Sequence, residues 1–153
     1  MSTLLSDEQR TTLVDLLRAA FPHDRFPVGP YRRTASAVVD AAAANPRLHA
    51  LLLQGLDDLD TQREVGFSTL DAETAQLVLR GIADTPFFLA VLDVAVVALY
   101  DDHEVWEILG YEGPSYDKGG YIDRGFDDLD WLPDPRIESW IDGDVTSNEG
   151  ASA

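Results

Sequence analysis

Residues 84–120 read DTPFFLAVLDVAVVALYDDHEVWEILGYEGPSYDKGG, and we expect this stretch to decide the fold. From Phe87 to Tyr100 only Asp93 carries a charge. A helix that is apolar on nearly every side must be covered all round, either by other helices or by lipid. Lipid is disfavoured because a membrane span needs about 20 apolar residues, more than this run supplies. The stretch therefore predicts the central helix of a soluble bundle.

Capping residues mark the ends of this helix and of a shorter one behind it. Asp84 or Thr85 can cap the first helix, and Asp101 or Asp102 can cap the second. Gly110 suits the left-handed turn that ends many helices. Within the second helix we expect Val105, Trp106 and Leu109 to share one face.

The loop behind the second helix is unusually aromatic. It carries Tyr111, Tyr116 and Tyr121 among glycines and a proline. Aromatic side chains with a polar group are common on contact surfaces. The tyrosines either fold back over the bundle or form a surface for a partner or ligand.

These features together resemble a known family. A pair of phenylalanines, an apolar helix ending in tyrosine, and then VWEILGYEGP and KGG are similar to the signature of the gluconate 2-dehydrogenase subunit 3 family. Weaker similarity extends back to Leu13, whereas Glu112 departs from the pattern because family members often carry a second proline there. The matching residues are Phe87, Phe88, Tyr100, Trp106, Gly110, Tyr111, Gly113, Pro114 and Gly120.

The resemblance implies a small, mostly helical subunit that accompanies a large flavin-dependent oxidoreductase of the glucose/methanol/choline type. FAD would belong to that partner, which would oxidise a sugar, a polyol or a sugar acid, and this chain would hold no cofactor, metal or catalytic residue of its own. We expect a non-catalytic subunit of a heterodimer or larger hetero-oligomer that stabilises its partner or helps it to mature. The predicted partner interface comprises Trp106, Tyr111, Gly113, Pro114, Tyr116, Tyr121, Trp131 and Trp140.

Two other classes of function stay open at this point. One is a free-standing acidic binding module, and the other is a small cofactor-independent enzyme that uses Asp93. A carboxylate within an apolar helix must be hydrogen-bonded, paired or protonated if it is buried. We expect Asp93 to bond to a facing arginine or tyrosine rather than to act as a catalytic acid.

Composition narrows the partners. The chain has 153 residues, with 28 acidic against 11 basic residues and a net charge of −17. The negative electrostatic potential of such a chain disfavours binding to nucleic acids and to anionic membranes. The absence of cysteine excludes disulfides and thiol chemistry. No leader pattern is visible at the start of the chain, so we expect a cytoplasmic complex, or a periplasmic or extracellular one if a partner carries the chain out.

The rest of the chain predicts four more helices, for five or six in all. Ser6 and Gln9 form a capping-box pattern that opens a helix running to Pro22. Helical spacing continues over 31–44, over leucine-rich residues 46–59 behind Asn45, and over 71–83. The expected fold is an all-α bundle over residues 1–121. Residues 122–153, with Phe126, Trp131 and Trp140, read as an extended aromatic arm that covers the body or a partner, followed by a disordered acidic tail.

Two polar clusters complete the sequence. Residues 23–33 read as a proline-containing loop with a basic cluster of His23, Arg25, Arg32 and Arg33, which is either solvated or a contact for carboxylates of a partner or of the chain itself. The acidic residues Asp57, Asp58, Asp60 and Glu64 lack the ligand spacing and the glycine of an EF-hand, so we expect no calcium site.

Overall fold

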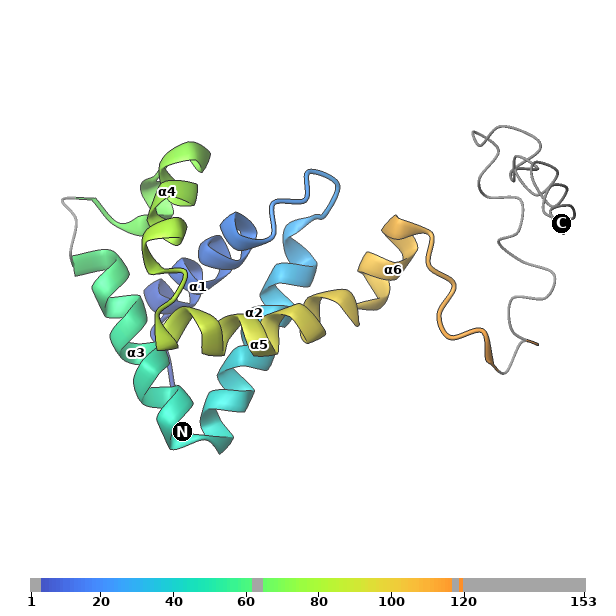
Figure 1. The fold of residues 1–153 in the computed structure, drawn as a ribbon, viewed down its shortest axis with the longest axis horizontal. Helices are drawn as coiled ribbons and strands as arrows, with labels where there is room; N and C mark the ends of the chain where they lie inside the picture. The colour runs from blue at the N-terminus through green and yellow to red at the C-terminus, as the bar shows by residue number, and fades with distance from the viewer. Residues whose placement is uncertain (1–3, 62–64, 117–118, 120–153) are drawn as a thin grey trace, which may run out of the picture. The chain divides into compact units, whose positions relative to one another are not determined.

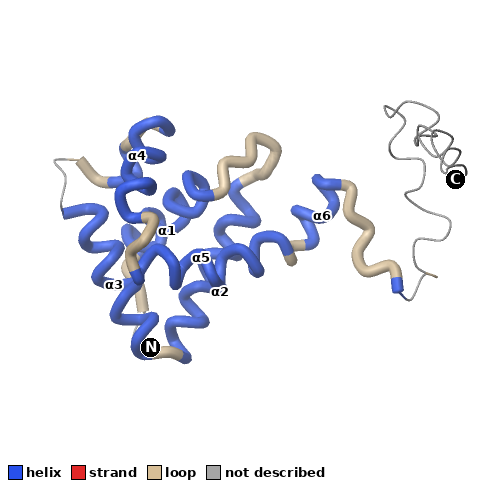
Figure 2. Tube along the Cα trace, in the orientation of Figure 1, coloured by secondary structure: helices blue, strands red, loops and turns tan. Residues whose placement is uncertain are grey.

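The computed structural model describes residues 4–61, 65–116 and 119, and over these residues the chain is helical and contains no β-strand (Figures 1 and 2). This confirms the predicted all-α class. The chain divides into a unit of Met1–Gly113 and a unit of Pro114–Ala153, and the fold described below is that of the first unit. Its elements are α1 (Asp7–Ala20), α2 (Val28–Ala44), α3 (Pro46–Thr61), the short 3₁₀ helix η1 (Phe67–Thr69), α4 (Ala72–Ile82), α5 (Pro86–Tyr100) and α6 (His103–Leu109).

Apart from α2, the α-helices begin at a residue whose side chain caps them. The Ser6 hydroxyl accepts from the Gln9 backbone N–H at 3.1 Å while the Gln9 side chain accepts from the Ser6 N–H at 2.9 Å, which confirms the capping box. Of the alternatives at the later helices, Thr85 caps α5 and Asp102 caps α6. Gly110 ends α6 at a φ of 74°, a left-handed conformation that glycine adopts without strain.

The start of α2 differs from the prediction. The helix begins at Val28 rather than at Tyr31, so Pro30 lies in its first turn. Proline is tolerated there because the first N–H groups of a helix have no partner within the helix. The predicted loop over 23–33 is therefore shorter, and Arg32 and Arg33 belong to α2.

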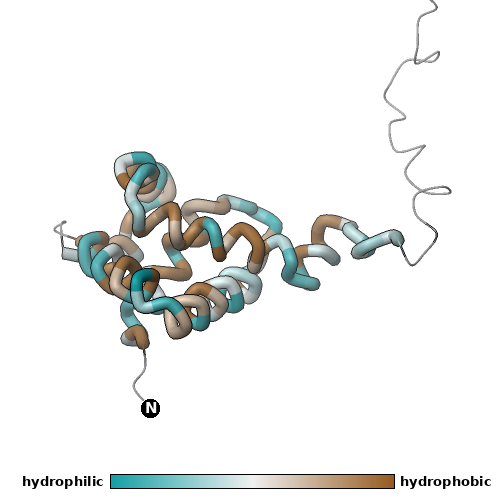
Figure 3. The backbone as a smooth tube through the Cα atoms, turned by 60° about the horizontal axis from the view of Figure 1, so that its bottom comes forward, coloured by the Kyte–Doolittle hydropathy of each residue, from teal (hydrophilic) through white to brown (hydrophobic). Residues whose placement is uncertain are grey.

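The helices pack around a leucine-rich core. In Figure 1, α5 lies across α2 and α3, while α1 packs against α2, η1 and α4. Hydrophobic and hydrophilic residues are interspersed along the helices, as expected for helices with one buried face (Figure 3). The largest fully buried side chains include Leu13, Leu16, Leu17, Tyr31, Val38, Leu52, Leu56, Phe67, Val91, Leu99 and Val105.

A glycine lets α5 approach α3 closely. Gly55 is buried in α3, and a β-carbon placed on it would lie 2.1 Å from Cγ of the Phe87 ring. Atoms cannot approach to that distance without a shift of the neighbour, so the packing of α5 on α3 depends on the missing side chain. The junction at this end of α5 is apolar.

Polar side chains fix the connections around α1. The Asp60 carboxylate accepts from the Thr12 hydroxyl at 3.0 Å and from the Phe67 N–H at 3.1 Å, which joins α1, α3 and η1. Asp60, one of the acidic residues considered for metal binding, thus has a structural role. The buried Tyr31 hydroxyl donates to the Phe21 carbonyl at 2.6 Å and anchors the end of α1, and burial raises the pKa of Tyr31.

Candidate functional site: the exposed face of α5 and its junction with α6

The central helix is covered on one side only by the residues that the structure describes. Phe87, Phe88, Val91, Ala95 and Leu99 are buried against the bundle. The opposite side exposes an apolar stripe, which we call the α5 stripe, made of Leu89, Val96, Val97 and Tyr100. The expectation that α5 is enclosed all round is therefore wrong for the described part of the chain, because α2 and α3, against which α5 packs, leave the stripe exposed.

The α5 stripe runs along one face of the helix and is interrupted only by Asp93. Val96 follows Leu89 by seven residues, and Tyr100 follows Val96 by four and Val97 by three, which places all four on one face of the helix. Val97 is 67% exposed and Leu89 is 50% exposed. Isolated exposed apolar residues are ordinary, whereas a contiguous group of them marks a contact surface.

Asp93 lies within this stripe, which corrects its predicted setting. The residue is exposed rather than buried, and no hydrogen bond or ion pair of its carboxylate occurs among the described residues. Position 93 is four residues after Leu89 and four before Val97, so it shares their face. The buried carboxylate on which the enzyme alternative depended is absent from this helix.

The carboxyl-terminal end of α5 is joined to α6 and α2 by charged groups. The Arg33 guanidinium on α2 donates to both carboxylate oxygens of Asp102, at 2.6 and 2.9 Å, and to Glu104 at 2.6 Å. Asp102 also accepts from the Glu104 N–H as the N-cap of α6. One carboxylate thus caps a helix and holds it against another.

The pKa values of this cluster are shifted in the directions that pairing dictates. Hydrogen bonding to Arg33 lowers the pKa of Asp102 below its usual value of 3.8, and hydrogen bonding to Asp102 and then Glu104 raises the pKa of Arg33. Asp102 is only 8% exposed, whereas Arg33 is 54% exposed. Asp102 and Arg33 therefore stay ionised at neutral pH.

Two other members of the predicted basic cluster act on the same junction. His23 and the Tyr100 hydroxyl lie 2.7 Å apart at hydrogen-bond distance, and Arg25 donates to the Ile108 carbonyl at 2.8 Å near the end of α6. The alternative in which the basic residues contact the chain's own carboxylates is confirmed for Arg33. Arg32, the preceding residue of α2, lines a groove between α1 and α2 instead and has no ion pair in the described residues.

Trp106 organises the aromatic part of the predicted interface. Its indole N–H donates to the Tyr100 carbonyl at 2.6 Å, and its ring contacts His103 and, edge to face at 5.2 Å, Tyr111. Gly113 lies beside the same ring, since a β-carbon on it would be 3.6 Å from the indole. The structure therefore brings Trp106, Tyr111 and Gly113 together.

The remaining predicted interface residues belong to the second unit or lie outside the described residues. Pro114 and Tyr116 belong to the second unit of the chain, where Tyr116 is 92% exposed. Tyr121, Trp131 and Trp140 lie outside the described residues, as does the predicted arm. The expected common face of α6 is confirmed only in part, because Val105 is buried and Trp106 half-buried, but Leu109 is exposed.

Sequence reasoning missed the α5 stripe. The sequence predicts cover on every side of this helix, so it does not distinguish the exposed Leu89, Val96 and Val97 from the buried positions. Only the position of Asp93, between Leu89 and Val97 on one face, marked the side that could face solvent.

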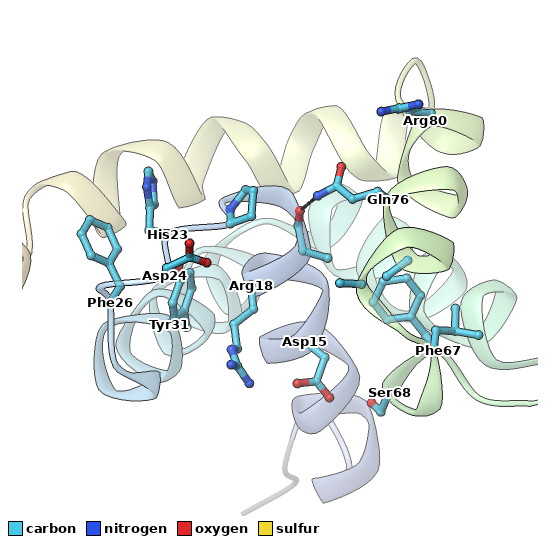
Figure 4. A pocket seen from close by; sticks show the side chains of 15 residues that line it. Asp15, Arg18, His23, Asp24, Phe26, Tyr31, Phe67, Ser68, Gln76 and Arg80 are labelled. Atoms are coloured by element: carbon cyan, nitrogen blue, oxygen red, sulfur yellow. Dashed lines mark hydrogen bonds between the residues drawn. The ribbon is translucent and has the colours of Figure 1, made fainter.

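A separate hollow of about 790 Å³ lies between α1, the loop behind it, η1 and α4 (Figure 4). Its polar lining combines both charges, with Arg18 and Arg80 against Asp15 and Asp24, and Gln76 donates to the Ala19 carbonyl within it. In Figure 4 the labelled side chains point in several directions rather than toward one point. The hollow shows no convergent set of catalytic groups.

Two further surveys concern metal ions and membranes. Over the described ranges, no three histidine or acidic side chains gather as they would around a metal ion. No single helix there is long and apolar enough to cross a membrane. The pair α4 and α5 would meet that test only together, and the two helices are bent by 112° at their junction.

Comparison of the chain with protein-family models, with curated proteins and with solved structures found no match in any of the three.

Proposed function

We propose that this chain is a non-catalytic small subunit that binds a large FAD-dependent oxidoreductase and stabilises it or helps it to mature. The partner's substrate class would be sugars, polyols or sugar acids, as the resemblance of residues 87–120 to the gluconate 2-dehydrogenase subunit 3 family implies. The observation that carries the binding role is the α5 stripe, with Leu89, Val96, Val97 and Tyr100 exposed on one helix face.

The physical argument concerns what such a face requires. Each large apolar side chain that leaves water contributes about 1.5–3 kcal/mol, so an uncovered stripe favours association with another surface. Helix faces with apolar residues at these intervals dock into hydrophobic grooves of partner proteins. Asp93 within the stripe would select a partner that offers a hydrogen-bond donor opposite it.

The junction of α5 and α6 supports the same role. Trp106 and Tyr111 lie at the end of α5 where Tyr100 ends the stripe, since the indole donates to the Tyr100 carbonyl. Tryptophan and tyrosine carry a large share of binding energy at protein interfaces. The α5 stripe and this aromatic pair would form one contact surface.

The test is affinity purification of the tagged chain from its native host, followed by visible absorption and mass spectrometry of what accompanies it. We expect a yellow complex with a roughly stoichiometric large flavoprotein. In Val97→Asp the charge would be buried at the interface, and we expect recovery of the flavoprotein to fall at least about tenfold.

Leu77→Asp is the matched control, because Leu77 is also exposed, at 58%, but lies on α4 outside the stripe. It should recover as much flavoprotein as the unchanged chain. A colourless chain recovered alone would contradict the proposal. Equal loss in both variants would show that the α5 stripe is not the contact surface.

A further inference from the structure

A second surface, a groove between α1 and α2, differs from the rest of this acidic protein. It has a volume of about 420 Å³ and a floor that includes Val14, Ala35 and Val39. Three arginines line it, Arg10 and Arg18 from α1 and Arg32 from α2, against one carboxylate, Asp15. Three of the chain's 11 basic residues thus gather here although the net charge is −17.

These arginines are available for a ligand. The two ion pairs of the described residues both belong to Arg33, so none of the three guanidiniums in the groove is paired with a carboxylate there. Arg18 and Arg32 are exposed and Arg10 is half-buried. The rest of the chain is acidic and repels an acidic group at long range. In this groove the arginines give such a group a favourable local contact.

The spacing along α1 indicates the shape of what would bind. Arg10, Val14 and Arg18 follow at intervals of four residues and so lie on one ridge of the helix. At a rise of 1.5 Å per residue, Arg10 and Arg18 are about 12 Å apart along the axis, with an apolar position midway. Two acidic groups placed two turns apart on a facing helix would each meet one of these arginines at that spacing.

We infer that this groove binds an acidic amphipathic helix of a partner protein, with two carboxylates spaced two turns apart and an apolar side chain between them. The two carboxylates of such a helix have the same spacing as Arg10 and Arg18, so each carboxylate can pair with one arginine. The apolar side chain between them would pack on Val14 in the floor of the groove. The groove shares no residue with the α5 stripe. The inference therefore goes beyond the proposed function and does not depend on it.

The probe is a blocked, alanine-based helical peptide with two glutamates placed two turns apart and a leucine midway, titrated into the full chain by calorimetry at low salt. We expect measurable binding that weakens as salt is added, since exposed charge pairs are screened. Replacing both glutamates by glutamine, or placing them one turn apart, should weaken binding about tenfold.

Variants of the chain locate the site. Arg10→Gln with Arg18→Gln should lower the affinity for the peptide about tenfold, whereas Asp15→Asn should raise it, because Asp15 repels the glutamates. Arg47→Gln is the control, since Arg47 is exposed on α3 and does not line the groove. Circular dichroism of each variant checks that these exposed substitutions leave the fold intact.

Several results would overturn the inference. They are no binding of the peptide at millimolar concentration, equal binding of the glutamine peptide, or unchanged affinity in the double arginine variant. Self-association of the chain that the double variant abolishes would assign the groove to a second copy and would equally refute an acidic partner helix.

Discussion

The two ends of α5 are held by different kinds of contact. At the amino-terminal end the Phe87 ring packs on the bare backbone of Gly55 in α3. At the carboxyl-terminal end, α5 and α6 are joined to α2 and the preceding loop through Arg33, Asp102 and Arg25. Apolar packing depends on shape, whereas the charged junction depends on pH and salt. The packing of α5 on α3 should therefore be sensitive to the volume of the side chains at the contact, whereas the attachment of α6 should be sensitive to pH and salt.

The largest effect is expected at the apolar end. Gly55→Ala places a methyl group where the Phe87 ring lies, which forces α3 and α5 apart and should lower the free energy of unfolding by about 2 kcal/mol. Urea denaturation followed by circular dichroism measures the loss. Gly81→Ala is the matched control on α4, since nothing lies within 4 Å of a β-carbon there. It should raise stability by up to about 1 kcal/mol, and equal stability of Gly55→Ala and the unchanged chain would refute the packing argument.

An intermediate effect is expected at the charged end. Arg33→Ala removes both ion pairs and should cost about 1 kcal/mol, because Arg33 and Glu104 are largely solvated while Asp102 is left with an unpaired charge. The loss should be local, so hydrogen exchange of α6 amides should accelerate more than that of α1 or α3. Arg32→Ala, beside it but without an ion pair, should leave α6 unchanged. Faster exchange throughout the bundle would contradict a local role.

The smallest effect concerns pH. Because Arg33 holds the pKa of Asp102 below its usual 3.8, this pair stabilises the folded chain at pH above that value. The contribution is lost as pH falls through the lowered pKa, when Asp102 binds a proton in the folded state. Asp102→Asn keeps a good N-cap but removes the charge, so it should flatten the acid dependence of α6 exchange below about pH 4. An unchanged acid profile in Asp102→Asn would assign that dependence to other carboxylates.

The sequence predicted the elements of this fold well because their signals are local. Three such signals are the capping side chain of Ser6, Pro86 directly after Thr85, and Gly110. Each acts over three or four residues, so a short stretch of sequence is enough to predict the helix boundary. The early start of α2 escaped prediction because proline is read as a helix breaker although it suits a first turn. The predicted contact role of Trp106 and Tyr111 identified a real aromatic pair but not the hydrogen bond to Tyr100 that positions it.

The composition of residues 87–100 by itself determined that this segment is an apolar helix of an all-α chain. Only the tertiary structure decided which face of α5 is buried, that Asp93 is exposed, and that Arg33 pairs with Asp102. The physical reason is that the hydropathy of a helix measures only the free energy gained when its side chains are removed from water. The number of neighbours that cover it, and the charges that meet across 69 positions of sequence, depend on the packing of the whole chain.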